Sequence, residues 1–200
     1  AGENALGLWL GRGWFARRSA HWLSDGSPRA RAVLTVTFTD GSTRTVATDG
    51  DWTARASPLL ENDIYDGEVY DARREADGWA SPGFDDADWD EAAVVDAPGG
   101  TLRPQRIESM DVIETVDVDA VHDHPDGPIL DFGQNLTGWL EIDVRDPAEG
   151  DEVTLCHAEA LTEGGDLSTT DLRTADATDT YVARGDADGV GTDELSPIHI

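Results

Sequence analysis

Carboxylates and tyrosines are interleaved in the segment Asp63-Ile-Tyr-Asp-Gly-Glu-Val-Tyr-Asp71. Aromatic rings stack on the C–H faces of sugars, and carboxylates accept hydrogen bonds from sugar hydroxyls. The composition of this segment therefore predicts a loop that recognises carbohydrate. Its candidate binding residues are Asp63, Tyr65, Asp66, Glu68 and Tyr70.

The same segment leaves two other interpretations open. Carboxylates that converge on one point could hold a Ca²⁺ ion. Alternatively, the segment is a structural loop whose Tyr rings pack against a β-sandwich. No other metal site is predicted: His122 and His124 lack a third ligand, and Asp186 and Asp188 lack the later ligands of a calcium loop.

The chain is so rich in acidic residues that a carboxylate, or a pair of them, is weak evidence for a functional site. The chain has 42 acidic and 14 basic residues, all of the latter Arg, and a formal net charge of −28. With so many acids, some pair will lie at the separation that glycosidases use, so a pair identifies no catalytic site. The charge excludes binding to nucleic acids and to anionic membrane surfaces, because both are negative. It favours the cytoplasm of a salt-accumulating organism, where salt screens the self-repulsion.

The remaining composition is that of a folded protein. Hydrophobic residues make up 38% of the chain and seven residues are Trp, which is enough apolar material for packed cores. Cys156 is the only cysteine, so no disulfide can form within the chain, and its position in an apolar strand pattern predicts a buried thiol.

Short strands separated by Gly and Asp turns predict an all-β protein with two β-sandwich domains. The clearest pattern is a hairpin in which residues 31–39 and 42–47 flank Asp40-Gly41. Only residues 158–161 suggest a helix. The other segments with strand character are residues 52–55, 111–118, 128–132, 140–145, 152–157 and 178–183.

Six sequence blocks, in order and at similar spacing, resemble the bacterial and archaeal α-L-rhamnosidases. The block Asp131-Phe-Gly-Gln-Asn-Leu-Thr-Gly-Trp139 and the acidic Tyr segment are the most specific. The blocks are residues 2–14, 63–73, 82–89, 131–139, 157–159 and 172–181.

This resemblance implies a galactose-binding-like β-sandwich over residues 1–109 and a concanavalin-like β-domain over residues 110–200. It places the catalytic acids of the family on an (α/α)₆ helical barrel, so no catalytic residue is expected in this chain. Gln134 and Asn135 are expected to position a loop against that barrel. The first sandwich is expected to lack its earliest strands and the second to be truncated at its carboxyl end.

The sequence thus predicts a fragment containing the accessory β-domains of an α-L-rhamnosidase, inactive alone. Its expected partner is a rhamnoside or a catalytic barrel domain. Two alternatives remain: a free-standing lectin-like module that uses the Tyr and Asp segment, or a remnant without function.

Overall fold

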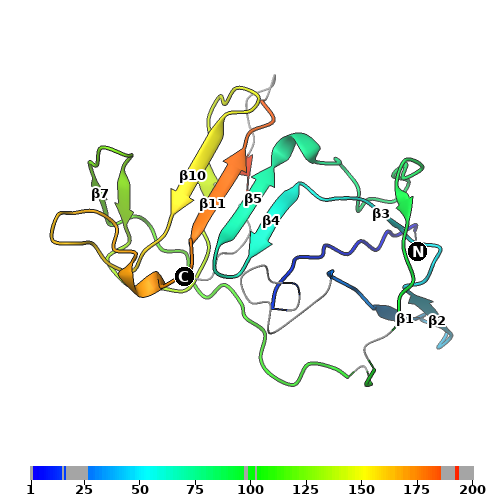
Figure 1. Ribbon diagram of the computed structural model, residues 1–200. Coiled ribbons are helices and arrows are strands. Elements are labelled where there is room, and N and C mark those ends of the chain that lie inside the picture. The colour runs from blue at the N-terminus through cyan, green and yellow to red at the C-terminus, as the bar shows by residue number, and fades with distance from the viewer. Residues whose placement is uncertain are drawn as a thin grey trace.

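The computed structural model describes residues 2–14, 16, 27–96, 99–101, 103–185 and 192–193. Its elements are almost all strands, and the two helices in this part of the chain are three-residue 3-10 turns, η1 (Ala72–Arg74) and η2 (Thr170–Leu172). The predicted all-β class is confirmed. Figure 1 shows a central sheet with smaller strand pairs on either side of it.

The predicted first hairpin is confirmed as β1 (Val33–Thr37) and β2 (Thr43–Ala47), paired antiparallel. Asp40 shapes the turn, because its Oδ1 accepts hydrogen bonds from the Ser42 amide at 2.9 Å and the Ser42 hydroxyl at 2.6 Å. Both interactions are local in sequence, which is why the turn was predictable.

The central sheet has the strand order β10-β11-β5-β4. Its members are β4 (Leu59–Asp63), β5 (Gly67–Asp71), β10 (Glu152–Cys156) and β11 (Thr178–Val182). Neighbouring strands are antiparallel except for β11 and β5, which pair in parallel with Tyr181 opposite Tyr70. The predicted boundary at residue 109 falls between β5 and β10, so this sheet contains strands from both sides of it.

Three further strand pairs complete the described topology, and each is antiparallel. They are β3 (Thr53–Ala54) with β6 (Asp90–Glu91), β7 (Ala120–His122) with β8 (Ile129–Asp131), and β9 (Ile142–Asp143) with β12 (Thr192–Asp193).

Four local predictions are wrong. Residues 63–71 are not a loop but part of the β4–β5 hairpin, and residues 111–118 form no strand. Residues 158–161 are not helical, since Leu161 instead forms an isolated bridge with Leu167. Cys156 lies on β10 as expected, but its thiol is exposed.

The core lies on one face of the central sheet. Tyr181 is 2% exposed and packs with Ala72 and Ala183, and apolar side chains from β5, β9 and β10 surround this group. The ring of Tyr70 stacks on that of Tyr181 with 6.1 Å between centroids, and the ring of Trp9 stacks on Tyr70 at 6.5 Å. The extended segment that carries Trp9 therefore covers the β5 part of this face.

Candidate functional site

The β4–β5 hairpin turns through residues 64–66, and contacts from two sides hold this turn. On the β4 side, Asp63 Oδ1 accepts a hydrogen bond from the Tyr65 amide at 3.0 Å. From the start of β11, the amides of Ala177, just before the strand, and Thr178, its first residue, donate to the carbonyl oxygens of Tyr65 at 2.9 Å and Asp66 at 3.0 Å. The backbone that presents Tyr65 is therefore fixed before any ligand arrives.

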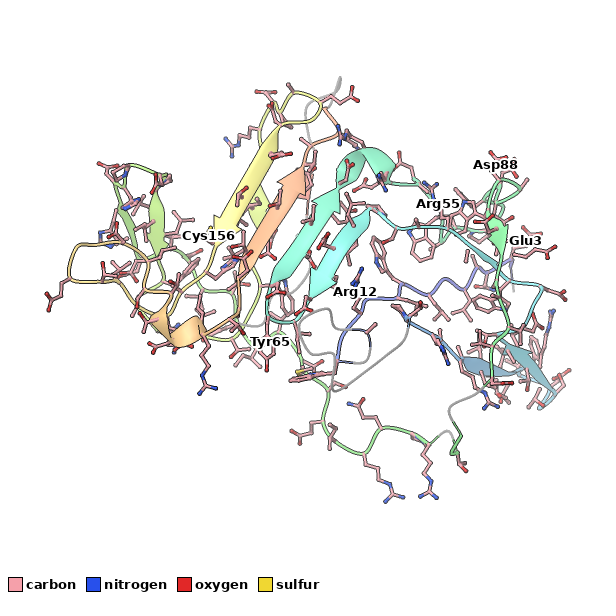
Figure 2. The ribbon with its side chains drawn as sticks, in the orientation of Figure 1. Glu3, Arg12, Arg55, Tyr65, Asp88 and Cys156 are labelled. Carbon is pink, nitrogen blue, oxygen red and sulfur yellow. The ribbon has the colours of Figure 1, made fainter. Side chains whose placement is uncertain are left out.

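Two aromatic rings are exposed at this turn. Tyr65 is 45% exposed and Trp14 is 60% exposed, and their ring centroids lie 6.0 Å apart at an interplanar angle of 81°. Asp66, next in the turn, is half-buried. Figure 2 shows Tyr65 at the lower end of the hairpin, with Arg12 beside β4. Exposed rings next to a carboxylate are the groups that contact sugars.

The inner face of the same hairpin carries a buried polar cluster. Asp179 on β11 is 1% exposed; its Oδ1 accepts from the Glu68 amide at 2.9 Å and its Oδ2 bonds His157 Nε2 at 2.9 Å. Glu68 is 4% exposed and accepts a long 3.4 Å hydrogen bond at Oε2 from Asn62. Its Oε1 has no hydrogen-bond partner among the described residues.

This environment raises the pKa of Glu68 to about 7. Burial is the main cause, because it disfavours the charged carboxylate, and the nearby negative charge of Asp179 adds to it. The hydrogen bond from Asn62 acts in the opposite direction but is weaker. Glu68 therefore keeps its proton to a higher pH than an exposed carboxyl group does.

Tyr70 also faces inward. Its ring lies in the stack between Trp9 and Tyr181, and its hydroxyl donates to Glu75 Oε1 at 2.7 Å. Glu75 Oε2 in turn accepts from Arg184, which follows β11, at 3.1 Å. This ring therefore has no free face to offer a sugar.

The five candidate binding residues are thus divided by the sheet. Tyr65 and Asp66 lie in the turn, Asp63 is buried at the end of β4 where it shapes the turn, and Glu68 and Tyr70 belong to the covered face. Because the backbone reverses at residues 64–66, these five side chains do not share one surface.

Gln134 and Asn135 lie on an exposed loop after β8, and the structure does not bring them to the hairpin site. Asn135 Nδ2 donates to Glu159 Oε2 at 3.1 Å, so the loop is tied to the segment that follows β10. Gln134 is exposed.

His122, the last residue of β7, and His124, just after that strand, both lie close to carboxylates. His122 Nε2 lies 3.4 Å from Asp131 Oδ2, and His124 lies 2.9 Å from Asp166 Oδ1 and 3.9 Å from Asp126 Oδ2. Within the described ranges, no three His, Cys, Asp or Glu side chains are grouped so that they could hold a metal ion. No helix in those ranges is long and apolar enough to cross a membrane.

Sequence reasoning missed Trp14 as a partner of Tyr65, and it missed Asp179 as the centre of the buried cluster. A signal for Asp179 was present. In the alternating segment 178–183 this residue shares a face with Tyr181, so an acid occupies an inward position and must have buried partners.

Two family models match the chain. Residues 1–114 match the model described as the α-L-rhamnosidase N-terminal domain, and residues 122–196 match the bacterial α-L-rhamnosidase concanavalin-like domain. Among curated proteins, the α-L-rhamnosidase of Streptomyces avermitilis is 34% identical over 92% of this chain and 18% of its own length. An α-L-rhamnosidase of Alteromonas sp. is 37% identical over 92% of this chain and 20% of its own length.

Solved structures agree with the sequence comparisons. The α-L-rhamnosidase of Dictyoglumus thermophilum superposes with a TM-score of 0.81 at 32% identity, over 92% of this chain and 20% of that one. The Streptomyces avermitilis enzyme complexed with L-rhamnose gives a TM-score of 0.72 at 33% identity, over 81% of this chain and 16% of that one. This chain spans about a fifth of the length of the relatives it matches.

Proposed function

This chain belongs to the α-L-rhamnosidase family, and from that membership we propose that it supplies non-catalytic β-domains that support the catalytic domain of such an enzyme. The observation that carries the proposal is the position of the match. It covers the N-terminal and concanavalin-like domain models and about a fifth of the relatives' length.

The buried carboxyl cluster supports a non-catalytic role for the described residues. Glu68 and Asp179 superficially resemble a glycosidase pair, because one carboxyl group has a raised pKa and the other lies nearby. A glycosidase must place the scissile bond of a sugar between its two carboxyl groups. Both side chains are instead enclosed by the sheet, with 4% and 1% of their surfaces exposed. We attribute a structural role to the pair.

The purified 200-residue chain is expected to release no p-nitrophenol from p-nitrophenyl α-L-rhamnoside, because the proposed role of its β-domains is non-catalytic and the Glu68–Asp179 pair is enclosed by the sheet. The measurement is absorbance over time in concentrated salt. A complete α-L-rhamnosidase assayed beside it is the positive control. Saturable release that co-purifies with this chain would contradict the proposed function.

A second candidate function, carbohydrate binding at the β4–β5 turn, is favoured by the exposed pair of Tyr65 and Trp14 beside Asp66. The turn is held by the backbone hydrogen bonds from Ala177 and Thr178, so little ordering entropy opposes binding. The structure of a relative in complex with L-rhamnose makes this sugar the first ligand to test. The proposal keeps Tyr65 and Asp66 as contact residues and gives Asp63, Glu68 and Tyr70 the role of supporting the turn.

Trp14→Ala is expected to weaken L-rhamnose binding by roughly fivefold, since one ring contact contributes about 1 kcal/mol. Isothermal titration calorimetry measures this, with and without Ca²⁺. Trp139→Ala is the matched control, because Trp139 is similarly exposed but belongs to the segment after β8. Equal affinity in the two variants, or no heat of binding for the unmodified chain, would contradict the proposal of carbohydrate binding at this turn. Neither result would bear on the proposed support of a catalytic domain.

We further propose that the loop of Gln134 and Asn135 contacts the catalytic domain, and that the chain divides into domains near residue 109. The exposure of both side chains supports the first point, and the hydrogen bond from Asn135 to Glu159 orients the loop. The limits of the two family models, at residues 114 and 122, support the second.

A further inference from the structure

Strands β5 and β11 are distant in sequence and meet in the centre of the sheet. Their parallel pairing begins at Val69 and Thr180. One residue earlier, the Glu68 amide donates its hydrogen bond to a side chain of β11 and not to the backbone of that strand: the acceptor is Asp179 Oδ1, at 2.9 Å. The Thr178 amide donates to Asp66 O at 3.0 Å, so the start of this junction depends on a few polar contacts.

Two carboxyl groups are enclosed at this junction, and only one of them is well satisfied. Asp179 has the Glu68 amide and the His157 ring as partners. Glu68 has only the 3.4 Å contact with Asn62, and its Oε1 is buried without a partner in the described part of the chain. A buried carboxylate that lacks hydrogen bonds is unfavourable, whereas the neutral acid is tolerated.

The groups that face Glu68 offer its charge little compensation. From β11 comes the carboxylate of Asp179, and beyond it His157, which follows β10, bonds Asp179 at 2.9 Å. From β4 comes the neutral amide of Asn62, whose Oδ1 is occupied by the Arg12 backbone amide at 3.1 Å. None of these contacts brings a guanidinium to Glu68.

We propose that Glu68, Asp179 and His157 form a proton-dependent clasp between β5 and β11, which is tight when Glu68 is protonated and loosens when Glu68 ionises. Protonated Glu68 leaves a single negative charge at the junction, on Asp179, where His157 and a backbone amide stabilise it. Ionised Glu68 adds a second buried negative charge, and separation of the strands relieves it by admitting water. This proposal concerns the fold and does not rest on the proposed function.

The direction of the pH dependence follows from the raised pKa. Folding moves the pKa of Glu68 from its ordinary 4.5 to about 7, so the folded junction binds more protons than the open one between these values. Its stability therefore falls as pH rises through this window and levels off above pH 7. Exposed carboxylates are already ionised above about pH 6, so they add little to this change.

Amide hydrogen exchange measures the junction directly. Between pH 6 and pH 8, at constant high salt, the protection factors of the Glu68 and Thr178 amides are expected to fall on the order of tenfold, after correction for the intrinsic exchange rate. The Thr48 amide, which donates to Ala32 O beside the β1–β2 hairpin, is the internal control and is expected to change little.

Glu68→Gln is expected to abolish the pH dependence at Glu68 and Thr178, since the amide cannot ionise. Glu91→Gln makes the same change at an exposed strand position on β6. This control variant is expected to retain the pH dependence of protection at Glu68 and Thr178. A pH-independent junction in the unmodified chain, or a dependence that persists in Glu68→Gln, would overturn the clasp.

A measurement without a variant covers the case in which Glu68→Gln does not fold. The ¹³C resonance of the Glu68 side-chain carboxyl in the unmodified chain should titrate with a midpoint near pH 7. A midpoint near the ordinary value of 4.5 would overturn the proposal.

Discussion

Replacing Gly67 by Ala is expected to lower the free energy of unfolding by about 3 kcal/mol or more. Gly67 begins β5 with a φ of +101°, a conformation that L side chains rarely adopt. A Cβ at this position would overlap the backbone carbonyl of Thr178 and lie 2.9 Å from Asp179 Oδ1. The backbone of β11 cannot move away without breaking the hydrogen bonds that start the parallel pairing.

Gly41→Ala is the matched control, and denaturant unfolding at constant salt is the measurement. Gly41 in the β1–β2 turn has a similar φ of +83°, but a Cβ there would meet nothing within 4 Å. Its cost should be confined to backbone strain, about 1 to 2 kcal/mol. Equal losses in the two variants would show that close packing of β5 against β11 contributes nothing at this position.

Tyr181→Ala is expected to lower the free energy of unfolding by about 4 kcal/mol, the usual range for removing a large buried ring. Tyr181 is 2% exposed and stacks on Tyr70, and the side chains of Val153 and Leu155 from β10 pack beside it. The truncated side chain would leave a cavity where β5, β10 and β11 meet, and rigid strands cannot close around it.

Tyr65→Ala removes the same ring from the exposed turn and should cost less than about 1 kcal/mol. The unfolding free energies of both variants are obtained from denaturant titrations. A small loss in Tyr181→Ala would mean that the central sheet is not the core of this chain, and that stability resides in other strand pairs.

The elements predicted correctly from the sequence depend on neighbours in the chain. The β1–β2 hairpin follows from alternating β-branched residues around Asp40-Gly41, and β10 and β11 follow from alternation in residues 152–157 and 178–183. In each case the alternating pattern lies within a short stretch of the chain, so propensity and pleat periodicity suffice to predict the strand.

The failed predictions involve partners that are distant in sequence. The residues 111–118 have strand composition but form no strand, which shows that β propensity alone does not supply a pairing partner. Residues 63–71 were predicted to be a loop because of their acids, yet Glu68 and Asp71 lie on β5 with buried side chains. Cys156 is exposed because it lies on the opposite face of β10 from Leu155, which packs toward the core.

By itself, the sequence determined the all-β class, the local hairpin and the family, because side-chain periodicity, turn residues and motif order are properties of the linear chain. Only the tertiary structure decided which acids have a special environment. Among the acidic residues that the structure describes, Glu68 has its pKa raised to about 7 because parallel pairing of β5 with β11 encloses it beside Asp179. Burial and charge proximity depend on contacts between residues more than a hundred positions apart, which composition and spacing do not record.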